Sequence, residues 1–310
     1  MNGLSDLQVN GYAGVDFNAE TLSAEDLHRA CETLQRDGMT AMLATIITDD
    51  VPAMGRKIQR ITELREHDAL ATSIIAGIHI EGPFISPADG YRGAHPLAAV
   101  KTANLDEAKQ LFDAANGLLR IFTLAPEQDP DGTVTRWLAD QNVMVSAGHT
   151  DASNDDLDRA IDAGLSMVTH LGNGCPTELP RHDNIIQRLL ARADHLVFGF
   201  IADGIHVPGF ALKNYLAAAG HERCFVVSDA SAPAGMGPGR YSLGRLSLDV
   251  GDDLTVRLPG TGQLAGSALP LRGAIEVLRQ QVGLTETAID WLVKDHPRSL
   301  LAGMTLGNPD

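Results

Sequence analysis

The sequence is poor in basic residues, in long apolar runs and in cysteine, and each shortage excludes a class of protein. Its 24 Lys and Arg residues stand against 40 Asp and Glu residues, which gives a net charge of −16 without any basic patch. A chain of this charge repels polyanions, so no nucleic acid partner is expected. No stretch approaches the roughly 18 consecutive apolar residues of a membrane helix, so no membrane association is expected.

The three cysteines are too few and too scattered for a disulfide framework. Cys31, Cys175 and Cys224 form an odd set, and the first residues lack the basic segment and apolar segment of a secretory signal. The expected location is therefore the reducing cytoplasm.

The sequence does contain a regular alternation of short apolar runs with amphipathic segments. Amphipathic helices are expected between the runs, several of them behind capping residues such as Ser23 and Ser153. The helical segments include Ala24–Asp37, Ala53–His67, Leu105–Ala115, Ser153–Ala163 and Phe210–Ala219. Eight runs are typical of buried parallel strands, namely Leu4–Asn10, Ala41–Ile47, Ser73–Glu81, Leu118–Leu124, Val143–His149, Met167–Leu171, Leu196–Ala202 and Cys224–Asp229.

The placement of polar residues separates a closed barrel from an open, doubly wound sheet. An open sheet gathers reactive residues at one switch point, whereas a barrel spreads them over the ends of many strands. Here such residues end six of the eight runs: Gln8 and Asn10, His79 and Glu81, His149, His170, Asp203 and His206, and Asp229. The prediction is an α/β chain with one (β/α)8 TIM barrel over residues 1–310, a β-hairpin at about 240–260 (strands Tyr241–Leu248 and Leu254–Leu258), and closing helices Leu269–Gln281 and Glu286–Lys294.

Three strand-end residues have the chemistry of metal ligands. Glu81 ends its strand at Gly82-Pro83 and shares a strand face with His79, so its carboxylate is expected at the barrel mouth. His149 and His170 end two neighbouring strands. A carboxylate with two imidazoles suits zinc, and three protein ligands with an open fourth place are typical of a catalytic site. The alternative for each is a paired, structural side chain in the core.

Asp229 and His206 are candidates for acid–base work. Asp229 follows a strand, where a helix cap is the ordinary explanation, but the Pro- and Gly-rich segment behind it disfavours a helix start. Near a metal-activated water its carboxylate could accept a proton and return it to a leaving amine. His206 follows the seventh strand, and a solvated loop histidine is an equally good interpretation from position alone.

Eight segments together resemble the N-acetylglucosamine-6-phosphate deacetylases of the amidohydrolase superfamily. They occur in order along nearly the whole chain, at 6–12 (Asp-Leu-Gln-Val-Asn-Gly-Tyr), 79–84 (His-Ile-Glu-Gly-Pro-Phe), 93–96 (Gly-Ala-His-Pro), 148–150 (Gly-His-Thr), 169–171 (Thr-His-Leu), 202–207 (Ala-Asp-Gly-Ile-His-Val), 228–235 (Ser-Asp-Ala-Ser-Ala-Pro-Ala-Gly) and 264–267 (Leu-Ala-Gly-Ser). The resemblance implies a metal-dependent amidohydrolase barrel that releases acetate from an N-acetylated amino sugar.

The resemblance also implies roles for individual residues. Glu81, His149 and His170 match the metal ligands, Asp229 the general base and acid, and His206 the residue that polarises the acetyl carbonyl. The expected substrate-binding residues are His95, Asn173, Gly174, Arg181 and His206, of which Arg181 resembles an arginine that reaches across a dimer interface. A homodimer is therefore expected.

The first predicted strand indicates how many metal ions the site is expected to hold. It carries Gln8-Val9-Asn10 in place of a His-x-His pair, as in family members that hold a single metal ion. One divalent ion is expected, zinc first, with iron and manganese as alternatives.

Two departures from the family pattern concern the substrate loop and the domain composition. Where the family usually reads Thr-His-Leu-Phe-Asn-Ala-Met and then Arg-Glu-Pro-Gly, this chain has Thr-His-Leu-Gly-Asn-Gly-Cys at 169–175 and Arg-His-Asp-Asn at 181–184. The small β-sandwich that family members build from both termini is expected to be absent.

Several other functions stay open at this point. The serious alternative is an amidohydrolase acting on another N-acyl or cyclic amide substrate. A glycoside hydrolase could use Glu81 and Asp229, but that function would not explain the two strand-end histidines. A metabolite-binding protein that has lost its activity is the third alternative, and the fact that all proposed catalytic positions are filled argues against it.

Overall fold

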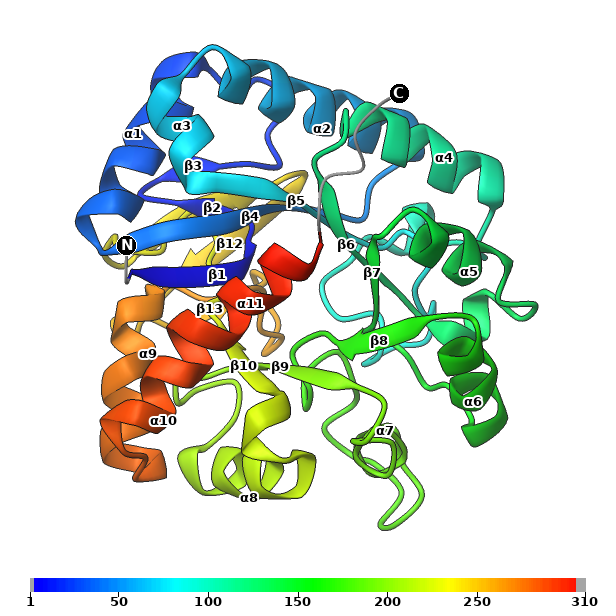
Figure 1. The fold of residues 1–310 in the computed structure, drawn as a ribbon. Coiled ribbons are helices and arrows are strands. Elements are labelled where there is room, and N and C mark those ends of the chain that lie inside the picture. Colours follow the sequence, from blue (N-terminus) through cyan, green and yellow to red (C-terminus); the bar gives the residue numbers. More distant parts are fainter. Residues whose placement is uncertain (1–2, 305–310) are drawn as a thin grey trace.

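A ring of eight parallel strands forms the centre of the molecule. The computed structural model describes residues 3–304, and Figure 1 shows the strands surrounded by helices. The sheet order is β1-β4-β5-β6-β7-β8-β9-β10. A parallel bridge between Val9 and Ala230 joins β1 to the end of β10, and the Asn10 N–H donates to the Ala230 carbonyl at 2.7 Å. The predicted (β/α)8 barrel is confirmed. The strands are β1 (Leu4–Val9), β4 (Met39–Ile47), β5 (Ile75–Glu81), β6 (Leu119–Leu124), β7 (Met144–Ala147), β8 (Leu165–Val168), β9 (Val197–Ile201) and β10 (Cys224–Val227).

The strands read as continuous apolar runs because both of their faces are buried. One face packs inside the ring, where Leu7, Leu43, Ile121 and Phe225 belong to one cluster. The other face packs against the outer helices. Several predicted strand bounds differ from the observed ones by one to three residues; for example, β7 and β10 end two residues before His149 and Asp229. Ser73 belongs to α3 (Ala69–Ile74), and the sixth strand begins at Leu165 and ends at Val168, so that His170 lies in the loop that follows.

The outer helices begin where the sequence supplies caps. Ser23 accepts the Asp26 N–H at 3.0 Å, and Ser153 forms a reciprocal capping box with Asp156. These helices are α1 (Ala24–Arg36), α2 (Val51–Glu66), α3, α4 (Leu105–Ala114), α5 (Thr133–Asp140), α6 (Asn154–Asp162), α7 (Ile185–Leu190) and α8 (Gly209–Ala219).

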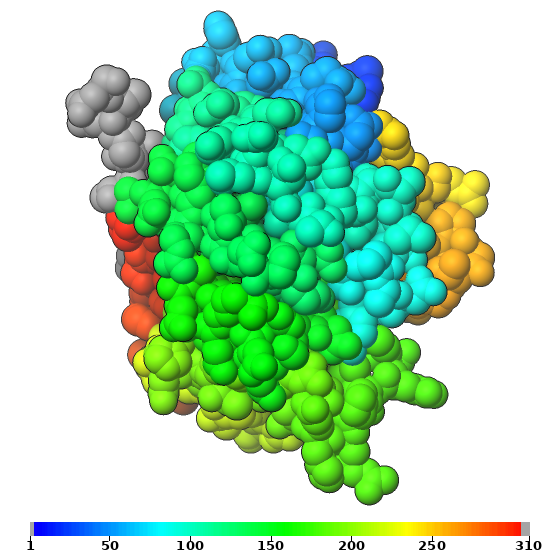
Figure 2. Space-filling model, turned by 90° about the vertical axis from the view of Figure 1, so that its right-hand side faces the viewer, coloured from blue at the N-terminus to red at the C-terminus, as the bar shows by residue number. Residues whose placement is uncertain are grey.

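The C-terminal segments lie at the two ends of the barrel. After α9 (Leu271–Val277) and α10 (Glu286–Asp290), α11 (His296–Gly303) crosses the end at which β1 begins, and Arg298 there donates to the Gly3 carbonyl at 3.0 Å. The small sheet of β11 (Gly239–Leu243), β12 (Leu246–Val250) and β13 (Val256–Arg257) lies at the other end. Figure 2 shows α11 in red and this yellow to orange region on opposite sides. The open end of the barrel is therefore the end with the carboxyl termini of the strands.

The small sheet corrects the predicted hairpin. The segment predicted as one strand over Tyr241–Leu248 is itself a hairpin, with its turn at Gly244. Gly244 has a φ of +57° and donates its N–H to Asp16 at 2.8 Å, so the chain reverses there. A short antiparallel pair, β2 (Gly11–Tyr12) and β3 (Val15–Asp16), supports this contact.

Within residues 3–304 no β-sandwich accompanies the barrel. In the same range no helix combines the length and the apolar character that crossing a membrane requires.

Candidate active site

A cavity of about 1150 Å³ opens at the carboxyl ends of the barrel strands. Its walls come from many strand ends and from the loop between β13 and α9, as expected for a barrel site. Nearly all the residues predicted for the site line this cavity: Glu81, His95, His149, His170, Asn173, Gly174, His206 and Asp229. Arg181 is exposed and is not among the lining residues. The barrel thus brings together residues that are up to 148 positions apart, from Glu81 to Asp229.

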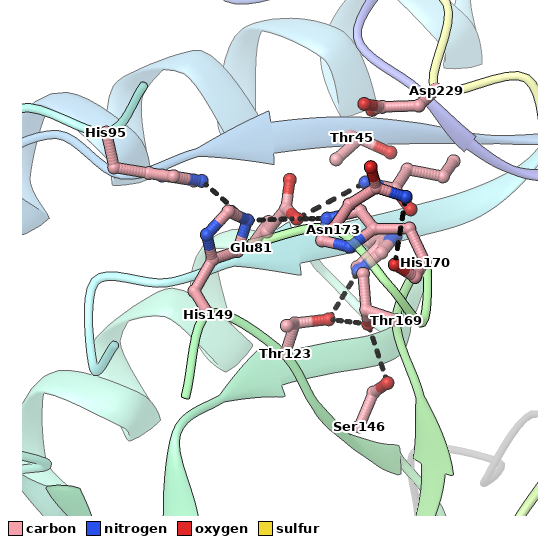
Figure 3. A network of polar contacts seen from close by, with 12 residues as sticks. Thr45, Glu81, His95, Thr123, Ser146, His149, Thr169, His170, Asn173 and Asp229 are labelled. Atoms are coloured by element: carbon pink, nitrogen blue, oxygen red, sulfur yellow. Dashed lines mark hydrogen bonds and ion pairs between the residues drawn. The ribbon is translucent and has the colours of Figure 1, made fainter. Parts of the chain in front are cut away.

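Glu81 is the centre of the polar contacts (Figure 3). Its Oε1 lies 2.9 Å from His170 Nε2 and 3.2 Å from His149 Nε2, and it accepts a hydrogen bond from Gln8 Nε2 at 3.3 Å. Burial by itself would raise the pKa of Glu81, but the contacts with the two imidazoles outweigh burial and hold the pKa well below its usual range. The carboxylate is therefore charged at neutral pH.

The backbone turns sharply where three of these residues leave their strands. His149, His170 and Asp229 have φ values of +52°, +34° and +49°. Non-glycine residues rarely occupy this left-handed region, and such residues are common at functional sites. The turn ends the strand and leaves each side chain in the cavity.

His95 lies closer to the metal-ligand candidates than the sequence indicated. Its Nε2 is 3.2 Å from His149 Nε2, and burial lowers its pKa to about 3. Within residues 3–304, the group whose ligand atoms all lie within 4.8 Å of one another is Glu81, His95 and His149. His170 joins this group through Glu81. Imidazole nitrogen and carboxylate oxygen are the donors that zinc and similar divalent ions prefer, so these residues fit such an ion.

Asp229 is held at the junction of β1 and β10. Asn10 Nδ2 donates to its Oδ1 at 2.7 Å, and burial together with the charge of Glu81 raises the pKa of Asp229 to about 6. A carboxylate with this pKa is ionised at neutral pH and still basic enough to take a proton. The backbone N–H of Ser228 donates to Asp6, at 3.1 Å from Oδ2, and so anchors the residue before Asp229. Sequence reasoning gave Asp6 no role, because a strand residue with a distant backbone partner leaves no local signal.

His206 is oriented by a carboxylate that the sequence analysis placed at a strand end without a role. Asp203 Oδ2 lies 2.7 Å from His206 Nδ1 and accepts a hydrogen bond from Ser267 Oγ at 3.1 Å. Burial opposes ionisation of Asp203, but the hydrogen bonds from the His206 ring and backbone outweigh burial and lower the pKa of Asp203. The pair leaves His206 Nε2 for a ligand in the cavity.

His79 belongs to a separate network beneath the site. Its Nδ1 lies 3.0 Å from the Leu7 carbonyl and its Nε2 lies 2.7 Å from Thr123 Oγ1, which continues to Thr169 and Ser146. Figure 3 shows this chain of hydroxyl groups below Glu81 and His149. Burial lowers the pKa of His79 to about 4, so the ring is neutral and supports the barrel interior.

Curated relatives of the chain are sugar-phosphate deacetylases. The N-acetylglucosamine-6-phosphate deacetylase of Bacillus subtilis is 32% identical over 293 residues, which cover 93% of this chain and 71% of that protein. The chain belongs to the N-acetylglucosamine-6-phosphate deacetylase family. The human enzyme of this name is 32% identical over 311 residues, covering 96% of this chain and 73% of that enzyme. An N-acetylgalactosamine-6-phosphate deacetylase of Shewanella is also 32% identical, covering 91% of this chain and 69% of that protein. No family model matches the chain.

Solved structures agree with this family assignment. A mutant of N-acetyl-D-glucosamine-6-phosphate deacetylase from Mycobacterium smegmatis, in complex with N-acetyl-D-glucosamine-6-phosphate, superposes with a TM-score of 0.87 at 27% identity. The match covers 97% of this chain and 77% of that one. The deacetylase from Pasteurella multocida gives a TM-score of 0.85 at 26% identity, covering 99% and 78%. The family resemblance and the amidohydrolase barrel predicted from the sequence are confirmed, and the chain is an amide-bond hydrolase by family.

Proposed function

We propose that this chain removes the acetyl group of N-acetylglucosamine-6-phosphate, or of a closely related N-acetylated amino sugar, and releases acetate and the free amine. The observation that carries the proposal is the combination of Glu81, two neighbouring histidines and a basic Asp229 in one cavity at the strand ends. The names of the relatives supply the substrate class.

Glu81, His149 and His170 would hold one divalent metal ion, with zinc as the proposed identity. The charged Glu81 carboxylate at the centre of two imidazoles is the donor set that such an ion requires. When bound, the ion would acidify a water molecule and polarise the acetyl carbonyl.

Asp229 then carries the proton through the reaction. Its carboxylate takes a proton as the water oxygen bonds to the acetyl carbon, and it delivers that proton to the nitrogen as the carbon–nitrogen bond breaks. Asn10 fixes one carboxylate oxygen and leaves the other for this transfer. His206, supported by Asp203, donates from Nε2 to a substrate oxygen where negative charge develops.

The sugar-phosphate end of the cavity has little positive charge within one chain. Among the described residues that line the cavity, Arg92 carries the basic side chain. Its guanidinium group already forms an ion pair with Asp89. Arg181 is exposed on the loop that follows β8. We propose a homodimer in which Arg181 of one subunit meets the substrate phosphate of the other, as the family resemblance implies.

A mixing experiment tests the dimer. Arg181→Ala and Asp229→Asn variants, each inactive on the phosphorylated sugar, should regain part of the activity when combined, because a mixed dimer contains one site with both native residues. A monomeric protein, or no recovery on mixing, contradicts the proposal.

The three cysteines bear on the cellular compartment. All are free thiols, and burial raises the pKa of Cys31 to about 12. This supports, as a proposal, action in the reducing cytoplasm.

An acetate-release screen tests the function. The substrates are N-acetylglucosamine and N-acetylgalactosamine, each with and without a 6-phosphate. Zinc-loaded enzyme should prefer a phosphorylated sugar, and Asp229→Asn should lose at least about 10³-fold in kcat while keeping its metal. Undiminished turnover of that variant removes Asp229 from the mechanism.

A second candidate substrate class follows from the loop at 172–184, whose sequence departs from the usual family pattern. The loop places Thr177, Glu178 and Leu179 in the cavity wall. Acetate release from none of the four sugars, by an enzyme that binds metal, would direct the search to other N-acyl or cyclic amides.

A further inference from the structure

Tyr215 forms part of the cavity wall beside the loop that follows β8. It is half-buried on α8, and both Ala211 and Tyr215 line the cavity. Residues four positions apart lie on one face of a helix, so this face of α8 borders the cavity. Leu212 and Leu216, on the neighbouring face, are buried in the core.

Two contacts fix the position of the Tyr215 ring. The ring stacks on Phe200 of β9, with ring centroids 6.3 Å apart and ring planes 15° apart. Phe200 is fully buried, so this contact is set by the core of the molecule. The edge of the ring meets the loop at Gly172, where an added Cβ would lie 3.3 Å from Tyr215 Cε2.

Gly172 leaves the space that this ring occupies. A Cβ at 3.3 Å is closer than the about 3.5–4.0 Å at which carbon atoms pack best, so a side chain at 172 would crowd the ring. The family pattern has phenylalanine at this position, and this chain has glycine. The chain therefore supplies from α8 an aromatic ring that the family pattern places on the loop.

The hydroxyl of Tyr215 is available to a ligand. Within residues 3–304 no protein group forms a hydrogen bond with it, and its oxygen is not enclosed in the core. Burial of the side chain raises the pKa of Tyr215, so the hydroxyl keeps its hydrogen at neutral pH. It can therefore donate a hydrogen bond to an oxygen of the substrate.

The neighbours of the ring indicate which end of the substrate it meets. Gly172 is followed by Asn173 and Gly174, which are expected to bind the substrate and which line the same cavity. None of the contacts of Tyr215 described above involves a proposed metal ligand or Asp229. Its hydroxyl is therefore placed for the part of the substrate outside the acetamide group.

We propose that Tyr215 is a specificity-determining residue, whose ring forms the cavity wall beside Gly172 and whose hydroxyl binds an oxygen of the amino sugar outside the acetamide group. This inference rests on the proposed deacetylation and adds to it a residue that recognises the sugar or its phosphate. Such an oxygen is bound equally in the ground state and in the transition state, so the hydrogen bond contributes to KM and leaves kcat unchanged.

Steady-state kinetics on N-acetylglucosamine and N-acetylgalactosamine, each with and without a 6-phosphate, test the inference. Tyr215→Phe removes only the hydroxyl and should raise KM about three- to tenfold, while kcat and the zinc Kd stay at the wild-type values. A rise confined to the phosphorylated sugars assigns the hydrogen bond to the phosphate. A rise that also affects a sugar without phosphate assigns it to a sugar hydroxyl.

Tyr241→Phe is the matched control. The Tyr241 hydroxyl already donates to the Gly237 carbonyl at 2.8 Å, and Tyr241 does not line the cavity, so the KM of this variant should equal the wild-type value. A wild-type KM for Tyr215→Phe on every sugar would overturn the inference.

A double-mutant cycle tests the role of the ring. Gly172→Ala introduces the Cβ that crowds Tyr215, and Tyr215→Ala removes the ring. The backbone strain of alanine at a φ of +92° is the same in both backgrounds, so the contact alone makes the two changes non-additive. Gly172→Ala should therefore raise KM less in the Tyr215→Ala background, by at least about twofold. Additive effects would show that the two positions do not share this space and would overturn the role of the ring.

The same measurements separate this inference from the proposed function. If the wild-type enzyme releases acetate and Tyr215→Phe has the same KM on every sugar, only the role of Tyr215 fails. If the zinc-loaded wild-type protein releases acetate from none of the four sugars, the proposed function fails and the inference fails with it.

Discussion

Gly93 and the His149 ring pack so closely that a single methyl group should disturb the metal site. A Cβ at Gly93 would lie 2.8 Å from His149 Cε1 and 3.1 Å from Nδ1. The ring would have to withdraw by roughly 0.6 Å to reach ordinary van der Waals contact. His149 Nδ1 is bonded to Tyr91, two residues before Gly93, so the ring cannot move without losing that contact.

Gly93→Ala should therefore impair the site more than the fold. Gly93 has a φ of +57°, and alanine in this region costs about 1–2 kcal/mol, which lowers the Tm by a few degrees. Because a misplacement of about 1 Å can cost about 10²-fold in rate, the displaced ring should lower kcat about tenfold or more. The zinc Kd should rise as well.

Gly117→Ala is the matched control for backbone strain. Gly117 has a φ of +77°, and no atom lies within 4 Å of the position of an added Cβ. Thermal unfolding, zinc titration and acetate release are measured on both variants. Similar losses of Tm with a loss of zinc affinity only in Gly93→Ala support the reasoning, whereas equal activities of the two variants refute it.

Three further predictions concern other parts of the chain. Asp203→Asn removes the charge behind His206 and should lower kcat/KM at least about tenfold with little change in zinc Kd; an unchanged kcat/KM would show that His206 needs no support. Burial and the charge of Glu81 raise the pKa of Asp229 to about 6, and Asp229 must be ionised to act as a base. The value of kcat/KM should therefore fall as the pH drops through about 6. A fall in kcat/KM on the acid side with its midpoint above pH 7 would contradict the assignment of Asp229 as the base. Lys57→Met removes the buried 2.7 Å partner of Asp49 and leaves it the exposed Arg245 at 3.2 Å. The loss in denaturant unfolding should approach the about 3–5 kcal/mol of a broken buried pair, and a loss below about 1 kcal/mol would show that Arg245 is a sufficient partner for Asp49.

Much of this site could be predicted from the sequence because barrels place strand ends at one mouth. Glu81, His149 and Asp229 each follow an apolar run that reads as a strand, and the parallel arrangement puts their side chains into a common cavity. Local pattern was also sufficient for the caps at Ser23 and Ser153.

The conformations of the loops could not be predicted from these sequence patterns. The turn at Gly244 divides a segment that alternates like one strand, because a hydrogen bond to the distant Asp16 decides it. His95 lies in a loop without periodicity, so its motif could not show that its ring faces His149.

The kind of fold, the residues available for chemistry and the family could all be read from the amino-acid order, since they depend on short-range periodicity and on motifs in sequence. Which atoms meet depends on the folded chain. Closing β1 against β10 brings Asn10 to Asp229, across 219 positions, and the loops after β4 and β5 bring Thr48 to His95. These contacts are set by long-range packing and hydrogen bonding, and they determine both the basicity of Asp229 and the direction in which His95 presents its Nε2 atom.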